Sequence, residues 1–562
     1  MNGLRRMESS GSRDSTTGAL TATLDVLLAA AVAAAVIVAM AGVDAQIFGM
    51  TVRAHGAGRV LILAGLLLGV RVWRGVRPMS AWLTRMILLV AVAASVATWL
   101  RFLLTTIGGA DSWGYVSASE LIRHGRLIDP APMAQWLSAS NRLAIASPLG
   151  WAPAPGEAGI APAYPLGLPI VMALFGALGG SNAVFFVSPI AAAIVLLLVY
   201  RLARQWYDGS VALLAVALVA WNPVFIAYAK QPMSDMVATM WVMLALWLAT
   251  LTSGASGLLA GLAAGSAIMT RPALLLVGGV IPLASYRADT PRSRVFATAA
   301  GVALVVVIQM AIQQLLFGSP FSTGYGSGAG LFAIDHLGTN ARIYLSHGWQ
   351  VVGVLWLPAL VLGLMAARPD PRWKPAAIFG AVTLPYLFYL PFDHWETLRF
   401  LLPGLVPLTI IAASGLALVA RLQKMSWVST AVVTAVMVIT IVPAERLLRA
   451  SSAWEISAIE ARYPLAGEWI NVNTPASSVV LANQHSGSLR WYGKRHTLRW
   501  DFIAPEQLVT TVRELQAHGA PVYVALEGDE VQMFNTRFAG VIDQLTVDPV
   551  GRIRNVSFLR LQ

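Results

Sequence analysis

The sequence of 562 residues contains no cysteine and few charged residues. The absence of cysteine excludes disulfide bonds, thiolate metal sites and cysteine nucleophiles. It does not exclude a domain outside the cytoplasm, because a domain with a large enough core needs no disulfide. Charged residues make up 12% of the chain, whereas soluble globular proteins carry about 25%. The composition therefore argues against an ordinary soluble protein.

Apolar residues account for 57% of the chain and gather in runs that recur along it. A helix that spans the hydrocarbon core of a membrane needs about 20 such residues. We therefore expect a polytopic α-helical membrane protein. The first apolar run, 24–41, follows a polar leader and is followed by no clean cleavage site, so we expect no signal peptide.

Basic clusters alternate between the apolar runs, and the excess positive charge behind the net charge of +12 lies before residue 444. In a membrane protein such clusters mark the cytoplasmic side, so they predict topology and not a nucleic-acid partner. We expect a cytoplasmic N-terminus and a tail outside the cytoplasm. About 13 transmembrane helices are predicted, at 24–44, 58–73, 85–105, 183–203, 209–228, 235–251, 256–270, 273–286, 294–316, 350–367, 375–391, 398–419 and 426–443.

The stretch YPLGLPIVMALFGALGG, residues 164–180, is apolar but carries two prolines and several glycines. This composition favours a re-entrant or interfacial helix over another span. A second long outside loop is expected at 318–348, and loops of this length usually carry function or are disordered. The expected organisation is a cytoplasmic leader (1–23), three transmembrane helices (24–105), an extracytoplasmic loop with interfacial helices (106–182), a transmembrane core (183–443) and a soluble α/β domain (444–562).

The tail after residue 444 differs in pattern from the rest of the chain. SSVVLAN and PVYVALEG are typical of buried strands, and PEQLVTTVRELQAHG is typical of an amphipathic helix that begins near Pro505 and ends at Gly519. The alternation of strand, helix and strand predicts a small α/β domain. The chain contains neither a GxGxxG motif nor a P-loop.

The stretch GGADSWGYVSASELIRHGRL, residues 108–127, follows the span expected at 85–105. Asp111 lies just past the end of that span, where a partly desolvated carboxylate can act as a general base. Trp113 and Tyr115 are suited to stacking on a sugar. The alternative is an ordinary aromatic belt at the membrane surface, with Asp111 as the N-cap of a following helix.

Three further ionisable residues are candidates for contacts with substrate, because such residues are costly in or near a membrane. Asp235 begins a predicted span just after Lys230 on the outside; the alternative for Asp235 is a carboxylate that only favours the helix dipole. Arg271 lies between two short apolar runs, in IMTRPALLL. An arginine there can bind a lipid phosphate in a bidentate manner, or it can simply extend toward the membrane surface.

The segment FDHWETLRFLLP, residues 392–403, places several ionisable residues between two spans. Glu396 and Arg399 are candidates for substrate contacts, with Arg399 as a second phosphate ligand. Asp393 and His394 could hold a divalent cation, but their spacing is not that of a metal motif, and solvated loop charge is the alternative.

Taken together, these pieces resemble the GT-C superfamily of integral-membrane glycosyltransferases, in the branch of the protein mannosyltransferases and aminoarabinose transferases. Asp111, Tyr115 and Gly125 are similar to the first outside loop of that family. Tyr164 begins a segment that resembles the family's Tyr-Pro-Pro-Gly helix, with Leu166 in place of the second proline.

Three later segments extend the resemblance over about 100–560. VYRLARQWYDGSVALLAVALVAWNPVFIAYAKQPMSD resembles the paired helices that lead to a second acidic residue, Asp235. GLAAGSAIMTRPALLL is similar to the family's Thr-Arg/Lys segment, and LRFLLPGLVPL to its Arg-Phe-Leu-Leu-Pro helix. The first loop has a single aspartate where the family has a pair, and no clear metal signature is present.

The resemblance implies transfer of a sugar, with inversion, from a polyprenyl-phosphate-linked donor to a glycan, lipid or protein acceptor at the outer face of the cell membrane. It implies that Asp111 is the catalytic base, that Arg271 and Arg399 stabilise the leaving phosphate, and that Tyr115 and Trp113 orient the acceptor. The resemblance implies no certain cofactor, and a divalent cation is the one candidate. The alternatives are a transporter or flippase for lipid-linked sugars, which would favour internal repeats, and a non-catalytic membrane scaffold.

Overall fold

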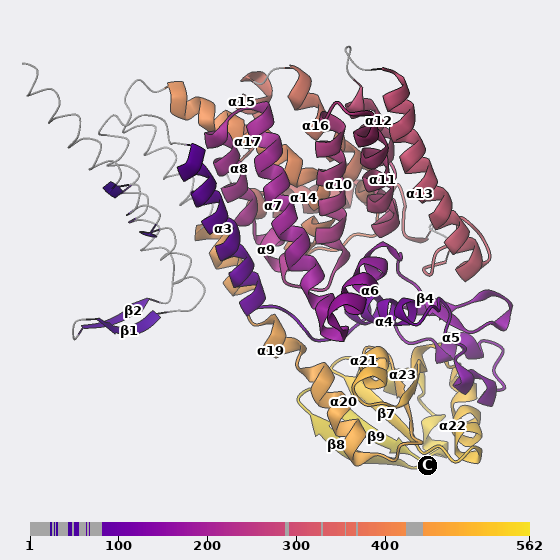
Figure 1. Ribbon diagram of the computed structural model, residues 1–562. Helices are drawn as coiled ribbons and strands as arrows, with labels where there is room; N and C mark the ends of the chain where they lie inside the picture. The colour runs from indigo at the N-terminus through magenta and orange to yellow at the C-terminus, as the bar shows by residue number, and fades with distance from the viewer. Residues whose placement is uncertain are drawn as a thin grey trace, which may run out of the picture.

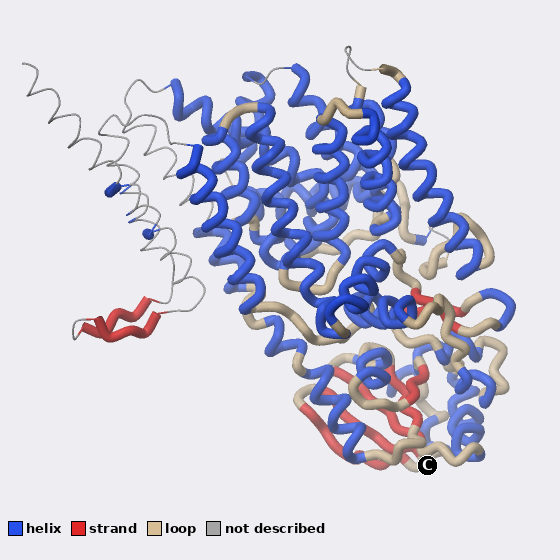
Figure 2. Tube along the Cα trace, viewed as in Figure 1, coloured by secondary structure: helices blue, strands red, loops and turns tan. Residues whose placement is uncertain are grey.

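The computed structural model describes residues 81–286, 291–326, 330–353, 356–366, 369–422 and 442–562, together with short pieces before residue 81. Figure 1 shows three parts: a bundle of helices, a layer across one end of it that contains α4 (Asp111–Arg123) and α6 (Gly167–Gly179), and a smaller domain beyond that layer. The strands lie in the smaller domain, in the layer and in an N-terminal hairpin (Figure 2).

The N-terminal hairpin pairs β1 (Val43–Ile47) with β2 (Met50–Ala54) in antiparallel register. Residues 43–44, expected to end the first span, are therefore part of a strand. The leader at 1–23 and the spans expected at 24–44, 58–73 and 426–443 otherwise lie wholly or largely outside the described residues.

Three helical stretches among the described residues are long and apolar enough to cross a membrane: Ser181–Trp206, Ser293–Phe317 and Trp395–Val419. Two bent helix pairs raise the number to five if each pair is one span. Four further apolar helices have 10–17 residues: Gly167–Gly179, Ser234–Thr250, Ala255–Thr270 and Pro272–Ser285. The bundle contains α3 (Ala81–Arg101), α7 (Val187–Trp206), α8 (Gly209–Ala220), α9 (Pro223–Ala229), α10 (Ser234–Thr250), α11 (Gly254–Thr270), α12 (Val277–Ser285), α13 (Ser293–Phe317), α14 (His336–Val352), α15 (Trp356–Ala366), α16 (Pro369–Leu387) and α17 (Leu402–Leu422).

The span expected at 209–228 is broken, because α8 and α9 meet at an angle of 67°. Asn222 and Pro223 cause the break. The side chain of Asn222 accepts hydrogen bonds from the backbone N–H groups of Val224 and Phe225, and Pro223 occupies the first turn of α9. A capping asparagine followed by proline starts a new helix and does not continue the old one.

The outside loop expected at 318–348 contains most of a helix that the sequence analysis did not predict, because α14 begins at His336 and continues to Val352. The segment is polar enough to be taken for a loop, but it buries one face, with Ile343, Tyr344 and Asn340. Asn340 donates hydrogen bonds to the carbonyl oxygens of Leu387 and Tyr389, at 3.1 and 2.5 Å. Partners distant in the sequence thus stabilise a helix that hydropathy alone does not reveal.

Small residues bring α11 and α13 into close contact. A Cβ atom at Gly261 would lie 2.0 Å from the carbonyl oxygen of Thr298, and one at Gly301 would lie 2.6 Å from that of Leu258. Small residues at such spacing let the backbones of membrane helices approach closely. This packing fixes the end of α11, and with it the residue that follows, Arg271.

The layer across the end of the bundle also holds α5 (Arg142–Ala146) and the short antiparallel pair β3 (Trp151–Pro153) and β4 (Ile160–Pro162). The stretch expected as an interfacial helix, 164–180, contains α6, which has 13 residues. At a rise of 1.5 Å per residue, such a helix is about 20 Å long, shorter than a hydrocarbon core of about 30 Å.

The C-terminal part is built on a five-stranded sheet of order β6-β5-β7-β9-β8. The strands β5 (Val479–Ala482) and β7 (Val522–Glu527) fall in the two stretches expected to be strands, and α22 (Leu508–Ala517) falls in the expected helix. These strands pair in parallel, as a strand–helix–strand unit requires. The other elements are β6 (His496–Leu498), β8 (Val547–Ile553), β9 (Val556–Leu561), α19 (Ile456–Glu460), α20 (Arg462–Asn473), α21 (Ser486–Trp491) and α23 (Glu530–Arg537).

Candidate functional site

A cavity of about 470 Å³ lies at the end of the bundle that faces the α4 layer. Its wall is formed by the start of α4, the segment before α6, the start of α10, the end of α11, the last turns of α13 and the segment between α16 and α17. Four ionisable residues predicted from the sequence line it: Asp111, Asp235, Arg271 and Arg399. Elements that are far apart in the chain thus bring these side chains to one cavity.

Asp111 is the first residue of α4, yet its side chain does not cap that helix. Its Oδ1 atom accepts a hydrogen bond of 2.5 Å from the hydroxyl of Tyr164. Its Oδ2 atom lies 3.6 Å from Nη2 of Arg399, and a third of the side chain remains exposed. The capping role considered from the sequence is therefore wrong, and the carboxylate faces the cavity.

Tyr164 and Tyr115 form an aromatic wall beside Asp111, with their ring centroids 4.8 Å apart. A Cβ atom at residue 114 would lie 2.4 Å from the ring of Tyr164, so the glycine there makes room for it. Burial, followed by the negative charge of Asp111, raises the pKa of Tyr164 far above its ordinary value. The phenol is therefore protonated at neutral pH and donates its hydrogen bond to the carboxylate.

Arg271 and Asp235 form a buried ion pair of 2.8 Å, with side chains 11% and 1% exposed. Nε of Arg271 also donates to the hydroxyl of Ser234 at 3.1 Å, and that hydroxyl accepts from Tyr115 at 3.2 Å. Arg271 therefore does more than extend toward the membrane surface. Its Nη1 atom is buried without a hydrogen-bond partner in the described part of the chain.

The two guanidinium groups share one aromatic ring. The Cζ atoms of Arg271 and Arg399 lie 5.2 and 5.1 Å from the centroid of Phe400. Arg399 also lies 5.2 Å from the ring centroid of Tyr228. Stacking on aromatic rings fixes an arginine without using its hydrogen-bond donors, so part of each guanidinium remains available to an anion in the cavity.

Three of the predicted substrate-binding residues lie outside the cavity lining: Trp113, Lys230 and Glu396. Trp113 is 6% exposed and packs between Trp151 and Trp491, with ring centroids at 6.5 and 6.3 Å. It cannot stack on a ligand in the cavity, because these rings already cover it.

Lys230 is fully buried and donates to the carbonyl oxygen of Ala453, while its Nζ lies 5.1 Å from the ring centroid of Trp454. It ties the start of the C-terminal part to the turn between α9 and α10. Glu396 is exposed. The structure thus gives neither residue a place at the cavity.

Several residues of the cavity wall escaped the sequence analysis. Ser234 is adjacent to Asp235 and connects Tyr115 to Arg271, but an isolated serine gives no signal in a sequence. The aromatic residues Tyr325, Tyr386, Tyr389 and Phe400 also line the cavity. Their distances along the chain from Asp111 hide this relation, and only the packing of α13, α16 and η6 (Trp395–Leu401) brings them together.

No group of three or more His, Asp or Glu side chains that could hold a metal ion occurs among the residues that the structure describes. Asp393, which was considered as a metal ligand with His394, lies 2.8 Å from Nε2 of His347. Within the cavity, the two carboxylates are those of Asp111 and Asp235, and each already has an arginine beside it. A divalent cation bound to these carboxylates would lie beside the positive charges of Arg271 and Arg399.

Residues 160–312 match a family model described as dolichyl-phosphate-mannose-protein mannosyltransferase. Comparison with curated proteins gives no match. Among solved structures, ArnT from Cupriavidus metallidurans bound to undecaprenyl phosphate is 12% identical, with 84% of this chain and 97% of that chain covered and a TM-score of 0.54. Its apo state is 14% identical, with 86% and 98% covered and a TM-score of 0.51.

The apo form of the Archaeoglobus fulgidus oligosaccharyltransferase is also similar, with 12% identity, 80% of this chain and 70% of that chain covered, and a TM-score of 0.50. At such identities the likeness shows the fold. It agrees with the family model over the middle of the chain and confirms the resemblance that the motifs indicated. The chain therefore has the fold of the integral-membrane glycosyltransferases of the GT-C superfamily, and its described residues include several helices long and apolar enough to cross a membrane.

Proposed function

We propose that the protein transfers a sugar from a polyprenyl-phosphate-linked donor to a hydroxyl of a cell-envelope glycan, lipid or protein. The observation that carries the proposal is the cavity in which the carboxylate of Asp111 lies beside two arginines, Arg271 and Arg399. A transfer of this kind needs a base for the acceptor and positive charge for the leaving phosphate. The similar fold of ArnT, a structure of which holds undecaprenyl phosphate, supports the class of donor.

In this mechanism Asp111 takes the proton from the acceptor hydroxyl. The oxygen attacks the anomeric carbon as the bond from that carbon to the phosphate oxygen breaks, so the configuration inverts. The bonding electrons leave with the phosphate, and the products are the glycosylated acceptor and polyprenyl phosphate. Tyr164 holds Asp111 through its 2.5 Å hydrogen bond and limits the directions in which the carboxylate can turn.

Arg271 and Arg399 stabilise the charge that develops on the leaving phosphate. The unpartnered Nη1 of Arg271 fits this role, because a buried donor is costly unless an acceptor reaches it. Asp235 holds the guanidinium through Nη2 and leaves Nη1 directed elsewhere. Asp235 therefore orients Arg271. The side chains of Tyr115, Tyr325 and Tyr389 also line the cavity and offer aromatic faces on which a sugar ring can stack.

The proposal is tested by transfer in nanodiscs with a defined polyprenyl-phosphate-linked sugar and candidate acceptors. Mass spectrometry of cell-envelope glycans and lipids, with and without the protein, identifies the acceptor first. We expect polyprenyl phosphate and glycosylated acceptor in equal amounts. Movement of the intact donor between leaflets without its cleavage would instead identify a flippase. If the protein neither transfers the sugar nor moves the donor, a non-catalytic scaffold is the remaining alternative.

We further propose that the N-terminus is cytoplasmic and that the site and the domain at 444–562 lie on the outer side of the membrane. The support is the alternation of basic clusters along the chain. Fusions to alkaline phosphatase, which is active only after export, should be active at Gln562 and inactive at Arg372. Activity at Arg372 with none at Gln562 would reverse the orientation.

A further inference from the structure

Segment 107–113 comprises the end of the connection from α3 and the first residues of α4, among them Asp111. The C-terminal domain touches this segment at both ends. On the N-terminal side, the backbone N–H of Ile107 donates a 2.9 Å hydrogen bond to the hydroxyl of Tyr492. On the C-terminal side, the ring of Trp113 packs so closely on α21 that a Cβ atom at Gly487 would lie 2.2 Å from it.

The closest approach is between Gly108 and Tyr463. A Cβ atom at residue 108 would lie 1.9 Å from Cδ2 of the Tyr463 ring, so only glycine allows the backbone to rest on this ring. Gly109 follows with a φ of +59°, in the left-handed region that favours glycine. The two glycines thus let the chain pass over the tyrosine and turn into α4 just before Asp111.

Tyr463 is itself held firmly. It is 1% exposed, and its hydroxyl accepts hydrogen bonds from Nε2 of Gln484 at 2.8 Å and from Nη2 of Arg462 at 3.3 Å. Its ring packs on His485 with centroids 4.7 Å apart. These contacts fix the position of the Tyr463 ring. The ring in turn restricts the position of the loop that packs on it.

A charged network in the C-terminal domain fixes the partners of Tyr463 in turn. Glu527 accepts from His485 at 2.9 Å and pairs with Arg462 at 3.0 Å. Burial alone would raise the pKa of Glu527, but the hydrogen bond and charge of His485, with the charge of Arg462, lower it below the ordinary value. Glu530 accepts from the backbone N–H groups of Gln484 and Glu527, each at 2.9 Å.

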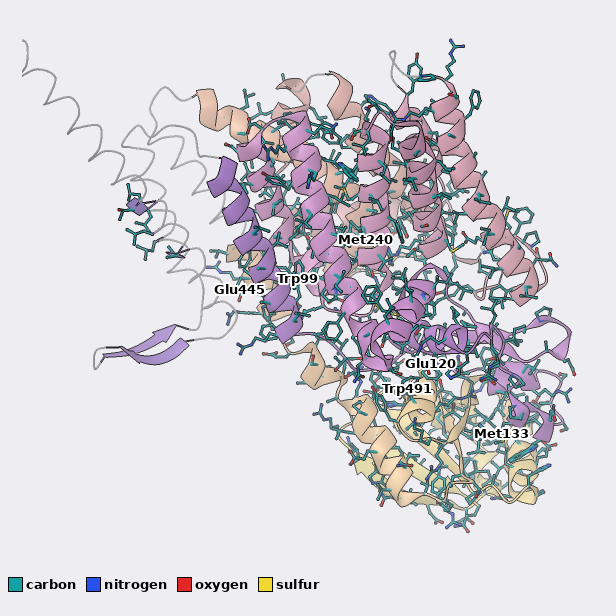
Figure 3. All side chains as sticks on the ribbon, viewed as in Figure 1. Trp99, Glu120, Met133, Met240, Glu445 and Trp491 are labelled. Atoms are coloured by element: carbon teal, nitrogen blue, oxygen red, sulfur yellow. The ribbon has the colours of Figure 1, made fainter. Side chains whose placement is uncertain are left out.

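We propose that the C-terminal domain positions the base of the transfer reaction, and that Tyr463 and Tyr492 are positioning residues that hold segment 107–113 and thereby set the place of Asp111. This inference rests on the proposed function. Figure 3 labels Trp491 on the C-terminal domain and Glu120 on α4, and a direct contact joins the two elements, because Trp491 packs on Trp113 of α4 with ring centroids 6.3 Å apart. The carboxylate of Asp111 meets Tyr164 and Arg399 only if the loop beneath it stays in place, and a displacement of about 1 Å can cost on the order of a hundredfold in rate.

The test compares Tyr463→Ala, Tyr492→Phe, Gly108→Ala and the double variant Gly108→Ala/Tyr463→Ala in the full-length protein in nanodiscs. Three quantities are measured: turnover and donor KM, thermal unfolding, and hydrogen exchange of peptides that cover 107–113. The control is Tyr523→Ala, which removes a buried tyrosine from β7 of the same domain; the hydrophobic cluster of Tyr523 includes neither Tyr463 nor Tyr492. A general loss of domain stability would affect the control and the test variants alike.

We expect Tyr463→Ala and Gly108→Ala to lower turnover by about ten- to a hundredfold, with donor KM changed less than about threefold. Hydrogen exchange in 107–113 should rise in Tyr492→Phe and Tyr463→Ala but not in Tyr523→Ala. The double variant should lose no more than Tyr463→Ala alone, because removal of the ring frees the space that the new Cβ atom needs.

Full turnover in a folded Tyr463→Ala protein, or an equal loss in Tyr523→Ala, would overturn the positioning role. Losses that simply multiply in the double variant would do the same. If the wild-type protein transfers no sugar, the proposed function fails. Hydrogen exchange then still tests whether the C-terminal domain holds segment 107–113: unchanged exchange in Tyr492→Phe and Tyr463→Ala would show that it does not.

Discussion

The two ends of the helix bundle both hold buried or partly buried charged residues, but these residues have different kinds of partner. At the end away from the α4 layer, Asp208 caps α8 by accepting from the N–H groups of Ser210 and Val211. At the same end, Arg294 is 3% exposed and its Nη2 donates to the carbonyl oxygens of Leu248 and Ala249, at 3.3 and 3.1 Å. Both charges bind backbone groups at helix ends, and Nη2 of Arg294 also donates to the hydroxyl of Ser256 at 3.4 Å.

At the end near the α4 layer, Asp111 starts a helix without capping it, and Arg271 follows α11 without binding the carbonyl groups at its end through its side chain. These side chains instead face other side chains and a shared cavity. The comparison teaches that burial of a charge near a membrane does not by itself indicate function. The partner of the charge distinguishes the two cases. A charge bound to backbone groups has a structural role, whereas a charge that faces a cavity is a candidate for a functional site.

The largest expected effect separates the two aspartates. Asn can accept the hydrogen bonds of a helix cap but cannot take a proton at neutral pH. Asp111→Asn should therefore lower turnover by about 10²- to 10⁴-fold, with donor binding little changed, whereas Asp208→Asn should leave turnover and unfolding nearly as in the wild type. Transfer assays and thermal melts measure both. An Asp111→Asn protein that melts normally and keeps more than about a tenth of wild-type turnover is incompatible with a base, and Asp235 would become the candidate.

The next effect separates the two arginines. Arg271→Ala should weaken use of the donor by about 1.5–3 kcal/mol, the scale of a hydrogen bond to a charged group. It should also destabilise the fold, because Asp235 is left buried without its partner. Arg271→Lys should restore only part of the donor use, since the planar fork is lost.

Two matched variants keep these effects apart. Arg271→Ala/Asp235→Asn removes the unpaired charge, so it should regain stability without regaining donor use. Arg294→Ala should destabilise the protein while donor KM stays unchanged. Donor kinetics of Arg271→Ala that equal those of the wild type would contradict a phosphate contact.

A smaller effect separates two tyrosines. Tyr164→Phe removes the hydrogen bond to Asp111 and should lower turnover by about tenfold, which corresponds to about 1.4 kcal/mol. Tyr200→Phe, at the opposite end, removes a hydroxyl that accepts from Arg204 at 3.3 Å, and transfer should be unaffected. Equal turnover in the two variants would show that Tyr164 does not orient the carboxylate.

Much of the site could be predicted from the sequence, because charged residues are rare in this chain and each is conspicuous beside an apolar run. Asp111, Asp235, Arg271 and Arg399 were identified in this way, and all of them line the cavity. The same low charge and recurrent apolar runs determined the helical membrane class. The stretches of β5 and β7 were apparent because buried parallel strands form short, continuous apolar runs.

Only the tertiary structure decided which of these residues meet, because partners far apart in the chain leave no local pattern. It paired Arg271 with Asp235 and placed Tyr164 on Asp111. It also turned Trp113 toward the C-terminal domain, since an aromatic residue looks the same in a sequence whether it faces a ligand or another tryptophan. The helix at 336–352 was missed for a related reason: its polar residues suggest a loop, and the carbonyl groups that stabilise it belong to the last residue of α16 and the chain after it.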